Sequence, residues 1–172
     1  VSVVVAAHNG ERYLQEAIDS ILSQTYRDFE LIVVNDASTD TTPAILDNRK
    51  DSRIKVLHNS EQQGLAASLN LGIDHAQGEY IARMDSDDIS EPGRLQSQVS
   101  FLDQNQGYGI VGTGYSTIDE HNQVLRKKLL FADDFAIRWR CFWNPHFIHP
   151  SVMIRKSILD DHELRYNPEF TT

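Results

Sequence analysis

The chain has 172 residues, 40% of them hydrophobic, which is enough for one domain with a buried core. Its formal net charge of −9 argues against nucleic acid or an anionic membrane surface as the main partner. A single cysteine, Cys141, rules out an internal disulfide and a cysteine zinc site, and no apolar run approaches the roughly 18 residues of a membrane span.

Strand patterns and helix patterns alternate four times over the first 105 residues. Runs of β-branched and other apolar residues predict strands at 1–7, 29–35, 54–58 and 80–84. Apolar residues spaced for one face predict helices at 11–25, 42–50, 65–76 and from 91 onward. This alternation is typical of βαβ units, so we expect an α/β fold with a Rossmann-like, mainly parallel sheet flanked by helices.

The rhythm changes after residue 105. A Gly-rich stretch at 108–119 predicts a bent strand, and a turn and a return strand follow at 123–130. An apolar pattern predicts a helix at 133–143, and a short strand is expected at 151–155. We expect a single domain over 1–172, truncated at its C-terminus, with a nucleotide-binding half at 1–105 and a smaller, mixed acceptor half at 106–172.

Three carboxylates, those of Asp85, Asp87 and Asp88, follow the fourth predicted strand directly. Two carboxylates about 4 Å apart repel by roughly 1 kcal/mol in water, and a cation between them would remove this repulsion. Hard carboxylate oxygens suit Mg²⁺ or Mn²⁺, which often bridge to substrate phosphates. The alternative is a solvated acidic turn before a helix, with Asp88 or Ser90 as its N-cap.

Polar residues also follow the first two predicted strands: His8, Asn9 and Glu11 after the first, and Asp36 after the second. In a parallel sheet the carboxyl ends lie along one edge, so these side chains can converge on one ligand. Asp36 could accept hydrogen bonds from ribose hydroxyls or a base imide, or it could serve as a turn residue. The chain has no Gly-x-Gly-x-x-Gly motif and no P-loop, so we expect a metal ion to hold any phosphate.

These segments resemble a family 2 glycosyltransferase. The resemblance covers nearly the whole chain and is carried by residues 3–11, 17–26, 29–42, 59–70, 78–88 and 149–155. It implies a GT-A fold and transfer of a sugar from a nucleotide diphosphate donor, usually UDP-linked, to an acceptor hydroxyl with inversion. It further implies a saccharide or lipid-linked saccharide acceptor in polysaccharide biosynthesis, and a cytoplasmic enzyme that could lie at the inner face of the membrane.

The resemblance also implies the site residues. The nucleotide-sugar site would be lined by Ala7, His8, Asn9, Glu11, Asp36, Ser68, Met84, Asp85, Ser86 and Asp87. His8 stands where the family commonly has a tyrosine, and an imidazole stacks on a base more weakly. Asp36 would contact the uracil or the ribose. Asp85, facing the ribose or a metal-bound water, and Asp87 would form the Mg²⁺ or Mn²⁺ site.

One part of the family pattern is missing. The family places an acidic pair, which supplies the general base, after a segment like 166–170, and that position falls beyond Thr172. Glu169 matches the spacer rather than the base. We therefore assign no catalytic residue and expect little or no transferase activity from the chain as printed.

Other function classes stay open from the sequence alone. A nucleotidyltransferase usually needs a Gly-rich, basic phosphate loop near the first strand, which residues 8–11 do not supply. A non-catalytic sugar-nucleotide binding module would keep the same acids, and a receiver-type signalling domain would need a late lysine, for which Lys156 is the nearest candidate. Three further expectations concern the second half: core positions for Trp139, Phe142 and Trp143, loop positions for His146 and His149, and a solvated strand end for Arg126, Lys127 and Lys128.

Overall fold

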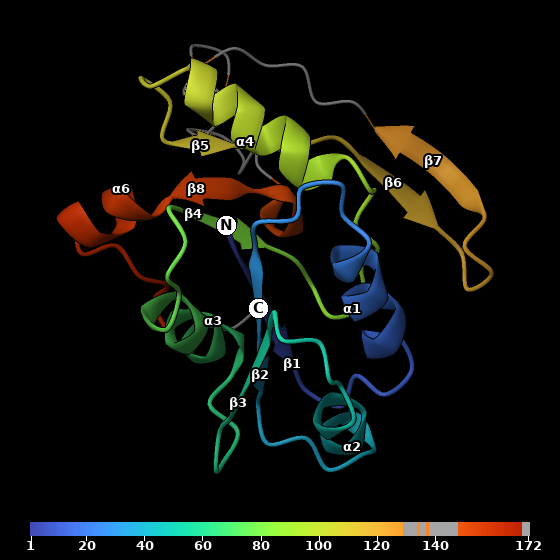
Figure 1. Cartoon of the computed structure of the whole chain (residues 1–172). Helices are drawn as coiled ribbons and strands as arrows, with labels where there is room; N and C mark the ends of the chain where they lie inside the picture. Colours follow the sequence, from blue (N-terminus) through green and yellow to red (C-terminus); the bar gives the residue numbers. More distant parts are fainter. Residues whose placement is uncertain (129–133, 135–136, 138–147, 170–172) are drawn as a thin grey trace.

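The computed structural model describes residues 1–128, 134, 137 and 148–169. Six of its strands form one mixed sheet in the order β3-β2-β1-β4-β8-β5 (Figure 1). The four parallel strands are β1 (Ser2–Ala7), β2 (Glu30–Asn35), β3 (Ile54–His58) and β4 (Tyr80–Arg83). Two antiparallel strands, β8 (Met153–Arg155) and β5 (Ile110–Val111), continue the sheet beyond β4. The prediction of an α/β fold with a mainly parallel sheet is confirmed.

Helices cover both faces of this sheet. They are α1 (Leu14–Leu22), α2 (Thr42–Asp47), α3 (Leu65–Asp74), α4 (Arg94–Gln104), α6 (Lys156–Asp161) and the 3-10 helix η1 (His149–Ser151). Side chains of a strand alternate between the faces, so Val3 and Val5 pack with α1 and α4, whereas Val4 packs with α3 and α6. Because both faces are buried, the parallel strands are continuously apolar, which is why their positions could be predicted.

The predicted boundaries needed several corrections. The first helix begins at Leu14 rather than residue 11, because residues 11–13 form a turn. The apolar spacing of the third predicted helix puts Leu65 on its buried face, but Leu65 is 39% exposed, since it is the first residue of α3, where that helix starts at the sheet edge. Helix α6 was not predicted, because it has six residues and follows β8 without an intervening turn signal.

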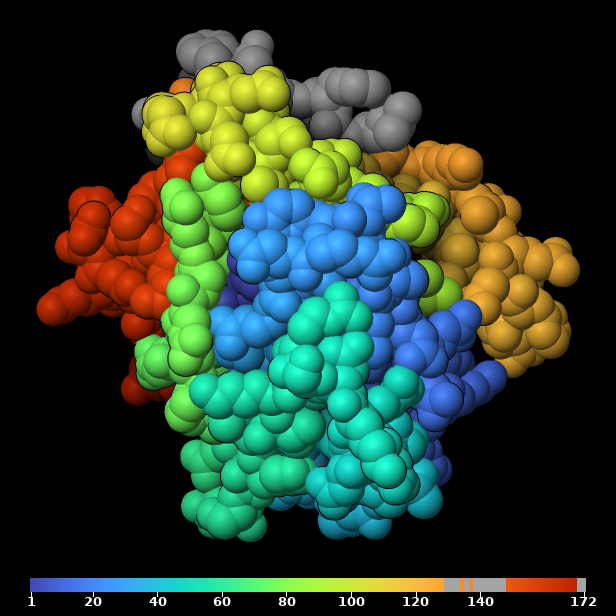
Figure 2. All heavy atoms as spheres, viewed as in Figure 1, coloured from blue at the N-terminus to red at the C-terminus, as the bar shows by residue number. Residues whose placement is uncertain are grey.

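The predicted bent strand at 108–119 is two separate strands. Its first part is β5 of the main sheet, and its second part is β6 (Tyr115–Ile118), which pairs with β7 (Val124–Lys128) in an antiparallel hairpin. Gly112 and Gly114 lie between the two strands, where the chain leaves the sheet. All residues of β7 are exposed, which confirms the solvated basic strand end, and Figure 2 shows the hairpin beside α1.

Some predictions fall outside the described part of the chain. These are most of the helix at 133–143, Cys141, the aromatic residues Trp139, Phe142 and Trp143, and His146. Within the described residues, no helix is both long enough and apolar enough to cross a membrane.

Candidate functional site

The carboxyl ends of β1, β2 and β4 meet at one edge of the sheet, as the parallel arrangement predicted. The register pairs Ala7 with Asn35, and the N–H of Asp36 donates to the carbonyl of Ala7 over 2.8 Å. The turn after β4 comes close to the loop after β1, because a Cβ built on Gly10 would lie 3.7 Å from Oγ of Ser86. The polar residues that follow the three strands therefore share one edge.

Asp36 is the most completely hydrogen-bonded carboxylate at this edge. Its Oδ1 accepts hydrogen bonds from Asn59 Nδ2 (2.7 Å) and the N–H of Gln63 (2.8 Å), and its Oδ2 accepts one from the N–H of Gly64 (2.8 Å). Nδ2 of Asn59 also donates to Oγ of Ser68 (3.0 Å), which lies in the first turn of α3. Burial alone would raise the pKa of Asp36, but these hydrogen bonds outweigh burial and lower it. Asp36 is thus an ionised carboxylate that joins β2 to the start of α3.

Asn9 and Glu11 link the loop after β1 to the loop after β2. Oδ1 of Asn9 accepts a hydrogen bond from the N–H of Thr39 (2.9 Å), and the N–H of Asn9 donates to Oγ of Ser38 (3.0 Å). Oε2 of Glu11 accepts from the N–H (3.1 Å) and the hydroxyl (2.8 Å) of Thr41. Asn9 has a φ of 52°, in the left-handed region that asparagine tolerates better than most residues. These partners were invisible in the sequence, so both side chains have a structural role besides any contact with a ligand.

The ring of His8 is fixed in one tautomer by its neighbours. Its Nδ1 lies 2.6 Å from the carbonyl oxygen of Asp36, which only accepts, so Nδ1 carries the proton. Nε2 then accepts the hydrogen bond from Nδ2 of Asn9 at 3.2 Å. His8 therefore presents an exposed and oriented ring at the sheet edge.

Ala7 and Met84 lie at the edge, but both bury their side chains in the core cluster against α1 and α4. Only their backbone groups are placed to contact a ligand. Ser86 is half-buried between the loops after β1 and β4. Of the ten predicted site residues, four are buried (Ala7, Asp36, Ser68 and Met84), two are half-buried (Asp85 and Ser86) and four are exposed (His8, Asn9, Glu11 and Asp87).

The acidic turn after β4 contains an ion pair. Nη2 of Arg83 contacts Oδ1 of Asp85, and the arginine side chain is 5% exposed whereas the aspartate side chain is 36% exposed. Asp87 is exposed. The pKa of Asp88 is raised by burial and by the charges of Asp85 and Asp87, although Arg83 and Arg94 oppose this shift. The turn therefore concentrates negative charge, as expected, but the buried Arg83 of the sheet and the half-buried Arg94 of α4 oppose it with positive charge.

A cavity of about 220 Å³ lies beside this turn. It is lined by Tyr13 and Glu16 of the α1 region, by Asp87, Asp88 and Ile89, and by Ile118, Asp119, Glu120 and Asn122 of the hairpin. The hairpin is held there by the hydrogen bond from Asn122 Nδ2 to Glu16 (2.7 Å) and by the ion pair of Arg12 with Glu120 (3.0 Å). Asp87 thus faces an acidic hollow between the first and second halves of the chain.

The donor set suits a divalent cation that arrives with phosphate. Among the described residues, no group of three or more His, Cys, Asp or Glu side chains is arranged to hold a metal ion. Asp85 and Asp87 offer hard oxygens at the sheet edge, and Mg²⁺ or Mn²⁺ is commonly held by one or two carboxylates together with substrate phosphates. The residues therefore fit the predicted metal, with the remaining ligands supplied by a substrate.

Sequence reasoning missed a second group of residues on the other side of Arg83. Nε2 of His149 lies 2.7 Å from the hydroxyl of Tyr166, and the two rings pack edge to face with centroids 5.1 Å apart. Burial and the charge of Arg83 lower the pKa of His149, and burial raises the pKa of Tyr166. Asn70 fixes the backbone of Tyr166 through two hydrogen bonds of 2.8 and 2.9 Å. One signal was available: Arg83 is a cation inside an otherwise apolar strand.

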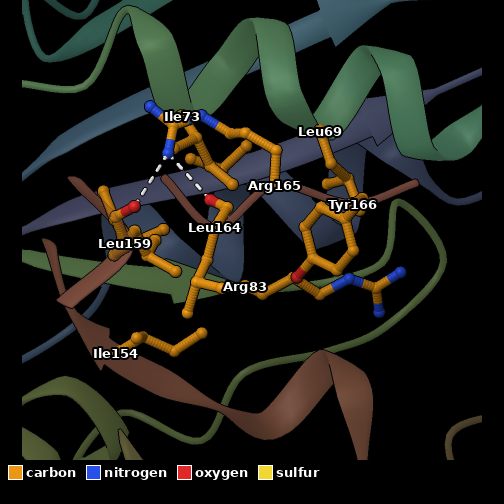
Figure 3. A pocket seen from close by; sticks show the side chains of 10 residues that line it. Leu69, Ile73, Arg83, Ile154, Leu159, Leu164, Arg165 and Tyr166 are labelled. Carbon is orange, nitrogen blue, oxygen red and sulfur yellow. Dashed lines mark hydrogen bonds between the residues drawn. The ribbon is translucent and has the colours of Figure 1, made fainter. Parts of the chain in front are cut away.

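Tyr166 and the stem of Arg83 also line an apolar cavity of about 190 Å³, on the face of the sheet that α3 and α6 cover (Figure 3). The cavity is otherwise bounded mainly by aliphatic side chains of β1, β4, α3, β8 and α6, among them Leu69, Ile73, Ile81, Ile154 and Leu159. The guanidinium group of Arg83 extends past the Tyr166 ring, away from these residues (Figure 3). The aliphatic part of the Arg83 side chain therefore lies in apolar surroundings, while its guanidinium group lies at the sheet edge beside Asp85.

The comparisons with solved structures agree with this architecture. The chain is similar to S. aureus TarS 1-349 in complex with UDP-GlcNAc, with a TM-score of 0.78, 23% identity, and coverage of 96% of this chain and 48% of that chain. It is also similar to the mannosyltransferase PcManGT from Pyrobaculum calidifontis in complex with GDP-Man and Mn²⁺, with a TM-score of 0.72, 24% identity, and coverage of 98% and 47%. The fold is that of the GT-A class, as predicted.

Sequence comparison places the chain within that class. The family described as "Glycosyl transferase family 2" matches residues 2–163, and the chain belongs to this family. EpsE of Bacillus subtilis (strain 168) is 49% identical over 160 residues, which cover 91% of this chain and 56% of EpsE. WbnJ of Escherichia coli, named an O-antigen biosynthesis glycosyltransferase, is 35% identical over 164 residues, which cover 92% of this chain and 63% of WbnJ. The chain thus spans little more than half the length of these relatives.

Proposed function

We propose that this domain binds a nucleotide-sugar donor at the carboxyl edge of its sheet and serves transfer of the sugar to an acceptor hydroxyl with inversion. The observation that carries the proposal is the meeting of Asp36, Asp85 and Asp87 at one edge in a chain of glycosyltransferase family 2. Family membership favours glycosyl transfer over nucleotidyl transfer. TarS with UDP-GlcNAc and PcManGT with GDP-Man have the same fold, which supports a nucleotide sugar as the ligand.

In this proposal the β1 and β2 edge holds the nucleoside. Asp36 retains acceptor capacity, because an ionised carboxylate has about four lone-pair sites and protein N–H groups take three of them. A ribose hydroxyl or a base imide N–H could use the remaining capacity. The oriented ring of His8 would stack on the base, while Asn9 and Glu11 keep the two loops together. Ser68 accepts a hydrogen bond from Asn59 and so helps to hold the amide that donates to Asp36.

The β4 edge holds the diphosphate in this proposal. Asp85 and Asp87 would hold Mg²⁺ or Mn²⁺, and the bound cation would neutralise the charge that develops on the leaving diphosphate. In the reaction, an acceptor oxygen bonds to the anomeric carbon, the bond from that carbon to the diphosphate oxygen breaks, and a base takes the acceptor proton. No residue of this chain is assigned as that base. Saccharides and lipid-linked saccharides are the proposed acceptors.

Calorimetric titration of UDP into the 172-residue chain tests the donor site. With Mn²⁺ we expect saturable binding, and with EDTA we expect binding to weaken by about tenfold or more, because the diphosphate would then face uncompensated carboxylates. D87N should resemble the EDTA result. D161N changes an exposed carboxylate of α6 and should match the wild type.

Each outcome bears on a separate part of the proposal. Equal UDP affinity in Mn²⁺ and in EDTA would contradict the metal while leaving the nucleotide site in place. Wild-type protein that binds neither UDP nor GDP under any of these conditions would contradict the nucleotide-sugar donor itself.

A further inference from the structure

Two buried arginines of the sheet differ in how their guanidinium groups are satisfied. Arg155, at the other end of β8 and β4, donates from Nε to the carbonyl of Tyr108 (2.9 Å), from Nη1 to the hydroxyl of Tyr80 (3.2 Å) and from Nη2 to the carbonyl of Leu102 (2.6 Å). Arg83 is buried more deeply, yet its Nε and Nη1 have no hydrogen-bond partner among the described residues. Native proteins rarely leave buried donors unpaired, so the two arginines serve different purposes.

The only side-chain partner of Arg83 in the described part of the chain is Asp85. Nη2 of Arg83 contacts Oδ1 of Asp85, and the side chain of Asp85 remains about a third exposed at the sheet edge. Oδ2 of Asp85 has no protein partner among the described residues. The ion pair therefore restrains one carboxylate oxygen and leaves the other accessible.

The surroundings of Arg83 do not explain the guanidinium as a stabilising feature. Its stem lines the apolar cavity beside Tyr166 (Figure 3), and a methionine side chain is close to that stem in length and is apolar. Removing one partner of an ion pair costs most where the remaining charge stays buried, and the side chain of Asp85 is 36% exposed.

We propose that Arg83 is a positioning residue of the donor site: it holds Oδ1 of Asp85 so that Oδ2 faces the diphosphate end of the ligand in one orientation. The inference rests on the proposed function, which places Asp85 at the diphosphate. The arginine also brings positive charge next to three carboxylates, those of Asp85, Asp87 and Asp88, where an anionic diphosphate must approach. Its unpaired N–H groups mark a residue kept for the ligand rather than for the fold.

The test compares R83M with the wild type in two measurements, the thermal midpoint and the affinity for UDP in the presence of Mn²⁺. We expect R83M to unfold at the same or a higher temperature and to bind UDP about tenfold more weakly, because it loses the charge-assisted contact and the orientation of Asp85. The matched control is R155M, which removes a buried arginine whose three guanidinium nitrogens each donate a hydrogen bond. It should unfold at a lower temperature and bind UDP as the wild type does.

A merely structural role predicts the opposite pattern for R83M, a lower midpoint with unchanged affinity in the folded protein, and that result would overturn the proposal. If R83M does not fold, R83K provides the test, because lysine keeps the positive charge but lacks the planar, forked donor geometry of the guanidinium group. Its UDP affinity should then fall by about threefold or more, and an unchanged affinity would overturn the positioning role. Absence of UDP binding by the wild type would instead overturn the proposed function, and this inference with it.

Discussion

The N–H of Gly64 donates a 2.8 Å hydrogen bond to Oδ2 of Asp36, which joins the end of β2 to the residue before α3. Gly64 has a φ of 86°, a left-handed conformation that glycine adopts without strain. Through this bond, and through those from Asn59 and Gln63 to Oδ1, one carboxylate arranges the whole segment that leads into α3. The conformation of the segment between β3 and α3 thus depends on a single buried charge.

Replacing that charge gives the first prediction. D36N puts an amide NH₂ where a backbone N–H now donates, so at least one buried donor loses its acceptor. We expect the free energy of unfolding to fall by about 1–3 kcal/mol, the usual cost of such a loss, and UDP binding to weaken. Urea denaturation at pH 7 measures the first effect. The exposed control D161N should change stability by less than about 0.5 kcal/mol, and a D36N protein as stable as this control would contradict the assigned network.

The second prediction concerns acid. Burial would raise the pKa of Asp36, but its hydrogen bonds lower it below the ordinary value of 3.8. A carboxylate with a lower pKa in the folded state stabilises the fold above its unfolded pKa, and this contribution is lost as the pH falls through the folded pKa. The stability difference between wild type and D36N should therefore be constant from pH 7 to about 5 and shrink below about pH 4. Urea unfolding of both proteins between pH 7 and pH 2.5 tests this, and a difference that does not change with pH would count against an ionised Asp36.

The third prediction separates backbone conformation from side-chain bonding at Asn9. N9G and N9A both lose the hydrogen bond from Thr39 to the Asn9 side chain, but only N9A forces a Cβ without polar groups into a φ of 52°. N9A should be less stable than N9G by about 1 kcal/mol, since the left-handed region costs an ordinary residue roughly 1–2 kcal/mol. Equal stability of the two variants would show that the loop relaxes out of this conformation. Both should weaken UDP binding, because the loop after β1 is no longer tied to Thr39.

The fourth prediction concerns the packing that places Ser68. A Cβ on Gly72 of α3 would lie 2.5 Å from Cγ1 of Val4 and 3.5 Å from Cγ2 of Val34, so G72A should push α3 away from the sheet. We expect a loss of about 1–3 kcal/mol in unfolding free energy from this overpacking. V4A creates space at the same point, and the double variant G72A/V4A should be more stable than the sum of the two single effects predicts. Strict additivity in a urea-denaturation cycle would contradict the close contact between α3 and β1.

Much of the architecture could be predicted because its causes are local. The four parallel strands are buried on both faces, so their apolar runs stand out, and helix periodicity marks the segments between them. Parallel strands place their carboxyl ends together, so the joint position of Asp36 and Asp85 followed from chain order alone. The short strand predicted at 151–155 is β8, but β5 has two residues, too few for a periodic pattern, and the split of 108–119 between two sheets left no local trace.

The partners of the polar side chains were beyond local reasoning, because they depend on groups far apart in the chain. Asn9 and Glu11 form hydrogen bonds with residues 30 positions later. The His149–Tyr166 pair is more than 60 residues from Arg83, the last residue of β4, in the chain. Arg83 could be recognised in the sequence as an unusual cation in an apolar strand, but its pairing with Asp85 and its two unpaired donors follow only from the packing around it. The sequence by itself thus determines which side chains lie at the sheet edge. Only the tertiary structure decides which of them form hydrogen bonds or ion pairs within the protein, because their partners are distant in the chain.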